Sequence, residues 1–294
     1  MTTSEAGRPN FFIIGAPKCG TTAMSRYLAD HPDIHMSKRK ELHFFNDDLH
    51  DPIVRRPWSS EVQYLKEFDA PSGTRIVGEA SVFYAYSDVA VSRIREFDTQ
   101  AKIAFMVRNP VDLVHSFHSQ LLFSGQETLR DLRDAWEKQD SREGSALLKY
   151  GEVARLGSQL KRVLSTFPKE QVHVTVYDDF KADPATAYAD MLHFLDVRPD
   201  GRADFPVVNA NRGYRWLGLH RIQRQLPNPS GLKRFLGIKR FGIFDRIDAI
   251  NFKRFERQRM PSDIQTEIAR HFTDEVRLLS DLLGRDLMAW VDRP

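Results

Sequence analysis

The sequence has a single cysteine, no long apolar run and no signal-peptide pattern. Among its 294 residues only Cys19 carries a thiol. One cysteine forms neither an internal disulfide nor a cysteine-rich metal site, so the fold does not depend on an oxidising compartment. The first ten residues, MTTSEAGRPN, lack an apolar centre, and no run approaches the roughly 18 apolar residues of a membrane span. We therefore predict a cytoplasmic protein with no membrane span.

The chain also lacks a strong charge of either sign. It has 43 Lys and Arg against 40 Asp and Glu, a net charge of +3, which argues against general nucleic-acid binding. Any anion site must therefore be local. With 41% hydrophobic residues the chain can bury a full core. We predict one domain over residues 10–294 and a short flexible segment over residues 1–9; the sequence does not indicate the oligomeric state.

Four short segments have the pattern of buried strands, and helical patterns separate them. Residues 11–14 are apolar at every position, as expected of a strand covered on both faces of a parallel sheet. The other strand candidates are residues 75–79, 102–107 and 172–177. This alternation predicts an α/β domain whose parallel sheet has helices on both faces and binds its ligand at the carboxyl ends of the strands.

Local capping signals predict where several helices begin and end. Residues 21–29 favour a helix, and the pairs Asn109-Pro110 and Asp183-Pro184 each place a capping side chain before a proline at the first helical position. Near the end of the chain, Ser262 begins a capping-box pattern, and apolar residues continue at helical spacing to Gly284. We therefore predict one long helix in that last region.

The segment Gly15-x-x-x-x-Gly20-Thr21-Thr22 lies between a predicted strand and a helix. Backbone N–H groups and the helix dipole hold a phosphate in this context. A nucleoside-triphosphate loop would have lysine directly after the second glycine, whereas here the lysine is Lys18. The strand 102–107 is followed by Arg108 rather than by an acid that could hold Mg²⁺. These differences favour a metal-free site for a sulfuryl group; the alternative is a tight turn that binds nothing.

The loop 17–22 resembles the 5′-phosphosulfate loop of the sulfotransferases that use 3′-phosphoadenosine 5′-phosphosulfate (PAPS), and residues 108–116 resemble their 3′-phosphate segment. The resemblance extends from about Asn10 to the C-terminus. It implies a P-loop NTPase-like three-layer sandwich with a mainly parallel central sheet, PAPS as co-substrate and 3′-phosphoadenosine 5′-phosphate (PAP) as product, with no metal. The nucleotide-binding residues implied by the two motifs are Lys18, Cys19, Gly20, Thr21, Thr22, Arg108 and Ser116.

Other readings of these residues remain open. Arg108 and Ser116 could instead belong to a helix cap with a surface ion pair. A later segment, 209–215, resembles the loop that closes over the nucleotide in this family, with Arg212 and Gly213 as candidates. An ordinary polar loop explains that segment nearly as well.

The stretch Lys40-Glu-Leu-His-Phe-Phe45 resembles the segment of heparan-sulfate-type sulfotransferases in which a glutamate is the base. This makes Glu41 the first candidate, with its apolar neighbours partly desolvating the carboxylate. His43 is the second, as in the cytosolic branch, because it lies on the same side of an extended segment. Alternatively, Glu41 pairs with Lys38 or Lys40 on the surface and His43 is a packed ring.

Lys18 would stabilise charge on the leaving oxygen in the transition state, unless it is an ordinary solvent-facing lysine. Many heparan-type relatives carry a lysine after the glutamate of a later G-E-K-like segment. This chain has Gly78-Glu79-Ala80 there, so Ala80 supplies no charge. Either Lys18 acts alone or another basic residue substitutes.

Together these features predict transfer of a sulfuryl group to a hydroxyl, or an amine, of a glycan or a small metabolite. A P-loop kinase and a catalytically inactive nucleotide-binding relative are the alternatives. The acceptor is undetermined, because loops such as 46–74 and 198–260 have no pattern that identifies it. Residues 233–259 hold nine Lys or Arg against three acids, which favours a solvated helical face over a surface for an acidic or membrane-associated acceptor.

Overall fold

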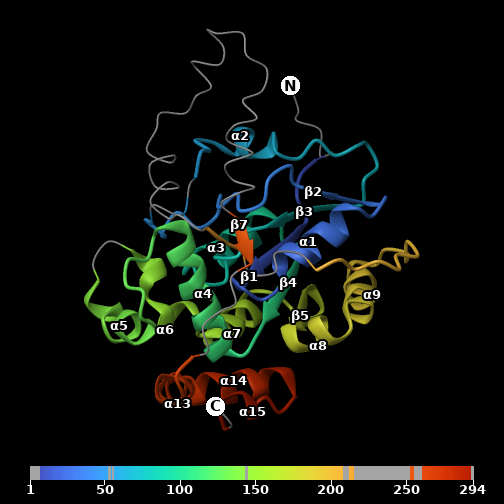
Figure 1. Ribbon diagram of the computed structural model, residues 1–294. Helices are drawn as coiled ribbons and strands as arrows, with labels where there is room; N and C mark the ends of the chain where they lie inside the picture. Colours follow the sequence, from blue (N-terminus) through green and yellow to red (C-terminus); the bar gives the residue numbers. More distant parts are fainter. Residues whose placement is uncertain are drawn as a thin grey trace.

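The computed structural model describes residues 7–51, 54, 56–142, 145–207 and 260–292, together with the backbone of residues 212–214 and 252–254. Its centre is a sheet in which every neighbouring pair of strands is parallel, in the order β2-β3-β1-β4-β5 (Figure 1). The strands are β1 (Phe11–Gly15), β2 (Ile34–Met36), β3 (Ile76–Ala80), β4 (Lys102–Val107) and β5 (Val172–Val176). Their carboxyl ends therefore meet at one edge of the sheet.

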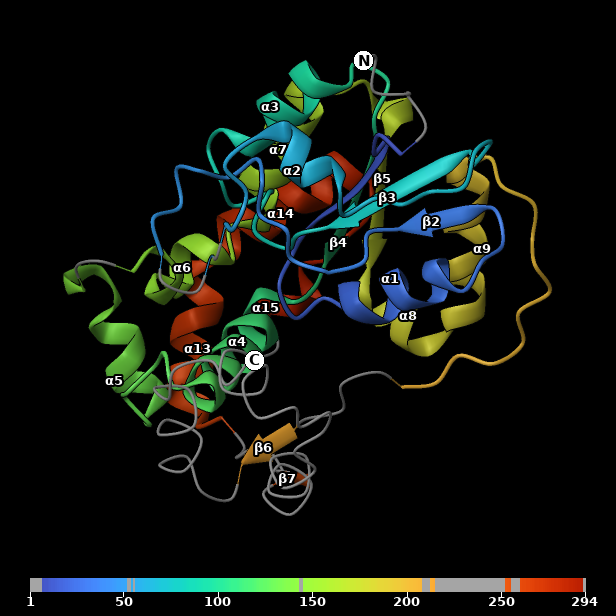
Figure 2. The same cartoon turned by 90° about the horizontal axis from the view of Figure 1, so that it is seen from above.

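Helices cover both faces of this sheet (Figure 2). One face carries α1 (Thr21–Ala29), α8 (Tyr177–Ala182) and α9 (Pro184–Leu195). The other carries α3 (Ala90–Phe97) and α7 (Leu156–Thr166), with α14 (Thr273–Leu283) packed on the outside of α7. The predicted three-layer α/β architecture is therefore confirmed.

The remaining helices extend the domain beyond the sheet. The long helix α4 (Pro110–Ser124) leaves the carboxyl edge and packs against α6 (Tyr150–Val153), α13 (Ser262–His271) and α15 (Ala289–Asp292). The shorter elements are α2 (Glu61–Leu65), α5 (Leu132–Glu137) and 3₁₀ turns at Gln139–Ser141, Ala146–Leu148 and Lys169–Gln171.

Several local signals in the sequence are present as working caps. The side-chain oxygen of Asn109 accepts a hydrogen bond from the amide of Val111 at 2.9 Å, and α4 begins at Pro110. Asp183 caps α9 in the same way, accepting from the amide of Thr186. The strand 102–107 has the predicted bounds, and residues 11–14 are completely buried within β1. These helix starts and strands were therefore predicted correctly.

The long C-terminal helix was predicted wrongly. Two helices, α13 and α14, meet at Phe272, whose ring is fully buried and packs edge-on against Trp136. The capping box is absent as well, because the cap position is Pro261 and Ser262 is already helical. Gly284 does end α14, with a left-handed φ of 64°. The packing of Phe272 is a long-range contact, so helical periodicity alone could not locate this break.

The N-terminal and the late segments are only partly described. Residues 1–6 lie outside the described part, whereas Arg8 donates to Glu61 at 2.8 Å and to the carbonyl of Phe97 at 3.0 Å. In the late region, β6 (Arg212–Tyr214) pairs antiparallel with β7 (Phe252–Arg254). The rest of the basic stretch 233–259 is outside the description. Among the described helices, none has the length and apolar character needed to cross a membrane.

Candidate active site

The predicted phosphate loop lies at the carboxyl edge of the sheet, between β1 and α1. The amide of Ala16 donates to the carbonyl of Met106 at 2.8 Å, which ties the start of the loop to β4. Gly20 occupies the cap position of α1 with φ 88°, and a Cβ there would lie 2.9 Å from the ring of Phe180. The first amides of a helix have no intrahelical acceptor, so this close-packed cradle fits an anion.

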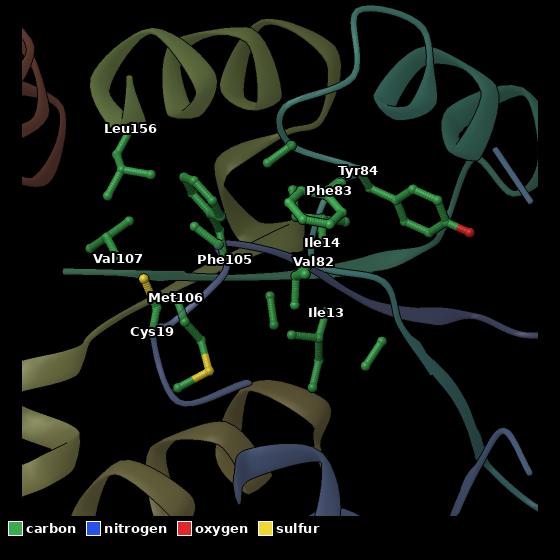
Figure 3. Close-up of a cluster of buried hydrophobic side chains, with 14 of the residues drawn as sticks. Ile13, Ile14, Cys19, Val82, Phe83, Tyr84, Phe105, Met106, Val107 and Leu156 are labelled. Carbon is green, nitrogen blue, oxygen red and sulfur yellow. The ribbon is translucent and has the colours of Figure 1, made fainter. Parts of the chain in front are cut away.

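Cys19 packs the loop against the sheet and is not a reactive group. Its side chain is fully buried, and Figure 3 shows it beside Met106 and Val107 of β4. Burial raises the pKa of Cys19 to about 12, although Arg108 and Lys18 act in the opposite direction. The thiol therefore stays protonated, and only the backbone of Cys19 is suited to bind a ligand.

Arg108 connects the end of β4 to the loop. Its Nη1 donates to the carbonyl oxygen of Lys18 at 3.2 Å, and its Nη2 donates to Asp112 at 3.0 Å. The guanidinium also lies over the ring of Tyr177, 4.5 Å from its centre. Its Nε is buried and has no hydrogen-bond partner among the described residues. The ion pair that the sequence offered as the alternative is thus present, between Arg108 and Asp112. Arg108 also binds the backbone of Lys18, within the phosphate loop.

The other predicted nucleotide-binding residues lie on four different segments of the chain. Thr21 and Thr22 begin α1, and Ser116 is buried two turns into α4, at 3% exposure. Lys18 is partly buried, in a left-handed conformation with φ 67°. Arg212 and Gly213 belong to β6 and pair with Arg254 and Lys253, but the side chain of Arg212 lies outside the described residues.

Glu41 lies beside the carboxyl end of β3. Its amide donates to the carbonyl of Ala80, and its Oε2 accepts from the amide of Val82, each at 2.9 Å. Lys40 forms an ion pair with the other carboxylate oxygen. The side chain is 34% exposed, so the carboxylate is partly buried. Phe44 and Phe45 turn away and join an aromatic cluster around Tyr64.

His43 also approaches Glu41, but not through an extended backbone. Both residues have left-handed φ values, 63° for Glu41 and 54° for His43, so the predicted extended segment is wrong. The tight path still brings Nε2 of His43 within 3.6 Å of Oε2 of Glu41. On the other side of the ring, Nδ1 lies 3.4 Å from Nδ2, the side-chain amide nitrogen of Asn46. With the Asn46 side-chain amide in this orientation, Nδ1 accepts, and the proton of a neutral ring is on Nε2, which faces Glu41.

The environment of His43 favours the neutral ring. The side chain is 5% exposed and stacks on Phe83. Burial lowers the pKa of His43, and the Glu41 carboxylate, which acts in the opposite direction, does not outweigh it. His43 is therefore a packed ring, as the alternative predicted, and it also lies beside Glu41, the first candidate for the base.

Glu79 is a residue of this region that the sequence reading missed. Its carboxylate is fully buried on β3 and accepts hydrogen bonds from Ser81 at 2.7 Å, from Tyr84 at 2.6 Å and from Tyr64. Burial raises the pKa of Glu79 to about 7, although all three hydroxyls favour the charged form. The available signal was a lone acid in an otherwise apolar strand, Ile-Val-Gly-Glu-Ala. In the sequence, the feature of this strand that stood out was Ala80 in the place of a lysine.

A cavity of about 720 Å³ lies beside the segment that follows Glu41. It opens between α3 and residues 44–61, and Phe44 and Trp58 line it together with charged side chains of both signs. Neither the phosphate loop nor Glu41 contributes to its lining. The charged lining residues are Arg8, Asp47, Arg56, Glu61, Arg93 and Glu96. In the described part of the chain, His, Cys, Asp and Glu side chains do not gather in threes as a metal site would need.

Comparison with known proteins identifies the family. Residues 8–205 match the family described as the sulfotransferase domain. The chain belongs to this sulfotransferase family. A solved sulfotransferase from Alicyclobacillus acidocaldarius is 30% identical, with a TM-score of 0.74, and the match covers 96% of this chain and 98% of that one. The P-loop NTPase-like sandwich expected for a sulfotransferase is therefore confirmed.

Two human proteins support the resemblance to the heparan-sulfate-type branch. Heparan sulfate glucosamine 3-O-sulfotransferase 5 is 27% identical over 211 residues, which cover 70% of this chain and 58% of the relative. Bifunctional heparan sulfate N-deacetylase/N-sulfotransferase 3 is 30% identical over 209 residues, covering 65% of this chain and 22% of the relative. This sulfotransferase chain thus spans little more than half of the first and about a fifth of the second.

Proposed function

We propose that the chain transfers a sulfuryl group from PAPS to a hydroxyl, or less readily an amine, of a glycan or small metabolite, with release of PAP. The observation that carries the proposal is the contact of Arg108 with the carbonyl of Lys18 at 3.2 Å. It joins the candidate 3′-phosphate and 5′-phosphosulfate segments at the edge of the sheet where α/β proteins bind ligands. The loop amides from Lys18 to Thr22 would hold the 5′ end, and Arg108 with Ser116 the 3′-phosphate.

PAPS, when bound, supplies the sulfuryl group; the chain supplies positioning, charge and a proton acceptor. Glu41 is proposed to take the acceptor's proton, because its partly exposed carboxylate is held in place by the amide of Val82. A neutral His43 with its proton towards Glu41 orients that carboxylate and does not replace it. Lys18 is proposed to stabilise charge on the leaving phosphate oxygen.

The donor assignment is tested by calorimetry with the purified full chain. PAP should bind more tightly than ATP with Mg²⁺, because Arg108 recognises a 3′-phosphate that ATP lacks. Tighter binding of ATP with Mg²⁺ would favour a P-loop kinase instead. Binding of PAP without transfer to any acceptor would favour the inactive relative.

The base assignment is tested by comparing Glu41→Gln with His43→Ala. Glu41→Gln should abolish transfer while leaving the affinity for PAP unchanged, and His43→Ala should retain part of the activity. Asp69→Asn is a matched control, because this exposed carboxylate pairs with Lys38 of the same segment and is not part of the proposed site. Retained transfer in Glu41→Gln together with complete loss in His43→Ala would reassign the base to His43.

The acceptor is proposed to approach along the cavity beside Phe44 and Trp58. Trp58 supports this because its indole nitrogen donates to the carbonyl of Leu42 at 2.9 Å, next to Glu41. The aromatic lining with both charge signs suits a polar ring such as a sugar. A screen of lysate metabolites and of heparan-type glycans with labelled PAPS would identify it. Location in the cytoplasm and the role of residues 233–259 stay predictions.

A further inference from the structure

A chain of hydrogen bonds connects the buried carboxylate of Glu79, through neighbouring hydroxyl groups, to the backbone of the segment after Glu41. Glu79 has no exposed surface, and each oxygen of its carboxylate accepts at least one hydroxyl proton. A hydroxyl has one proton to donate, so Ser81 and Tyr84 have only lone pairs left for other partners. Those lone pairs accept from the main chain of the segment that follows Glu41. The amide of His43 donates to Ser81 at 3.1 Å, and the amide of Phe44 donates to Tyr84 at 2.9 Å.

The segment that receives these bonds is conformationally unfavourable. Glu41 and His43 both have left-handed backbones, a conformation that costs about 1–2 kcal/mol for a residue with a Cβ. Such conformations persist where the surrounding structure over-determines them. Here the surrounding structure is the end of β3 and the turn after it. Two further hydrogen bonds add to those of the Ser81 and Tyr84 hydroxyls. The carbonyl of Ala80 accepts from the amide of Glu41, and the amide of Val82 donates to the carboxylate of Glu41.

The turn after β3 is itself rigidly attached to the sheet. The amide of Ser81 donates to the carbonyl of Ile13 at 3.1 Å, and that of Ala85 donates to the carbonyl of Ile14 at 2.9 Å. Figure 3 shows Phe83 and Tyr84 on the same side of the sheet as Leu156, with the hydroxyl of Tyr84 directed away from the hydrophobic cluster. Movement of Ser81 or Tyr84 would therefore disturb the core.

We infer that Glu79 is a positioning residue which, through the hydroxyls of Ser81 and Tyr84, holds the backbone of residues 43–44 and thereby aims the carboxylate of Glu41. The inference rests on the proposed function, in which Glu41 takes the proton. Glu79 itself does not contact substrate, because it is fully buried behind Ser81 and Tyr84.

Two tyrosines provide a matched pair of variants. Tyr84→Phe and Tyr64→Phe each remove one phenol hydroxyl from the same carboxylate, but only the hydroxyl of Tyr84 also accepts from an amide of the held segment. Tyr84→Phe should lower the rate of sulfate transfer from labelled PAPS into a metabolite extract at least about tenfold, because a misaligned base loses orientation. Tyr64→Phe should stay within about twofold of wild type. The affinity of both variants for PAP should be unchanged.

A second measurement, hydrogen exchange at backbone amides, does not depend on sulfotransferase activity. Hydrogen exchange of the full chain should show faster exchange at the amides of His43 and Phe44 in Tyr84→Phe and in Ser81→Ala, but not in Tyr64→Phe. Equal rates of transfer and exchange in Tyr84→Phe and Tyr64→Phe would overturn the inference. If wild type transfers no sulfuryl group, the proposed function fails, and hydrogen exchange still decides whether the hydroxyls of Ser81 and Tyr84, which donate to Glu79, order residues 43–44.

Discussion

Arg108 holds Lys18 through its carbonyl oxygen rather than through its side chain. The donor Nη1 and the acceptor oxygen are 3.2 Å apart, so the last residue before α4's cap directly restrains the loop after β1. The same guanidinium lies over Tyr177 at the start of α8. One side chain thus joins the end of β4, the loop after β1 and the start of α8 at the carboxyl edge of the sheet, and replacing it should affect both loop geometry and phosphate recognition.

Arg108→Lys keeps the charge but removes the planar fork, so it separates these two effects. We expect the affinity for PAP to fall about 10- to 100-fold, because the substitution removes one or two charge-assisted hydrogen bonds to the 3′-phosphate. Affinity for adenosine 5′-monophosphate, which lacks the 3′-phosphate, should change little. Calorimetry with both nucleotides measures the ratio, and Arg277→Gln, an exposed arginine on α14, is the control. Equal losses for the two nucleotides would mean that Arg108 acts only through the loop.

Gly20→Ala tests whether the phosphate loop depends on close packing. The new Cβ would lie 2.9 Å from the ring of Phe180, at a residue with φ 88°. Gly73→Ala is a close control, because Gly73 has φ 86° and a methyl group added there would have no neighbouring atom within 4 Å. We expect Gly73→Ala to cost about 1 kcal/mol of unfolding free energy and Gly20→Ala clearly more, with loss of PAP binding. Urea unfolding and calorimetry check both, and equal costs would remove the packing argument.

The parts of the site that the sequence predicted are those encoded locally. The glycine spacing around Gly20, the position of Arg108 at a strand end and the Asn109-Pro110 cap each depend on a few adjacent residues. Their elements appear where the pattern placed them. Local geometry of this kind is available to sequence reasoning because neighbouring residues determine it.

The surroundings of Glu41 were predicted poorly because they depend on distant residues. Its left-handed backbone is stabilised by a turn about 40 positions later, where the amide of Val82 donates to its carboxylate, and the neighbouring Phe44 stacks on Tyr64. Glu79 was missed for the same reason, since a buried carboxylate requires partners that no short motif reveals. The break at Phe272 likewise reflects packing on Trp136, which lies far away in the chain.

Cys19 should be inert towards thiol reagents in the folded protein. Its side chain is fully buried, and burial raises the pKa of the thiol to about 12, so almost no thiolate exists at neutral pH. Reaction with a chromogenic disulfide should proceed only as the protein unfolds in urea. The signal is unambiguous because the chain has no other cysteine. Rapid reaction in native buffer would contradict the burial of the loop, and PAP should slow any reaction that proceeds through local opening.

Glu79 should make stability depend on pH in a direction opposite to that of an ordinary surface acid. Its pKa is about 7 in the folded chain against 4.5 as the ordinary value, so the folded state binds the proton more tightly. The stabilisation from this proton is complete below about pH 4.5 and is lost as the pH rises through 7. Between pH 5 and pH 8, wild type should therefore lose about 2 kcal/mol relative to Glu79→Gln, which has no such proton. Urea unfolding of both proteins at the two pH values gives this difference, with Glu61→Gln as a control for an exposed acid. A difference that does not change with pH would mean that Glu79 is already charged at pH 5, held by its three hydroxyl donors.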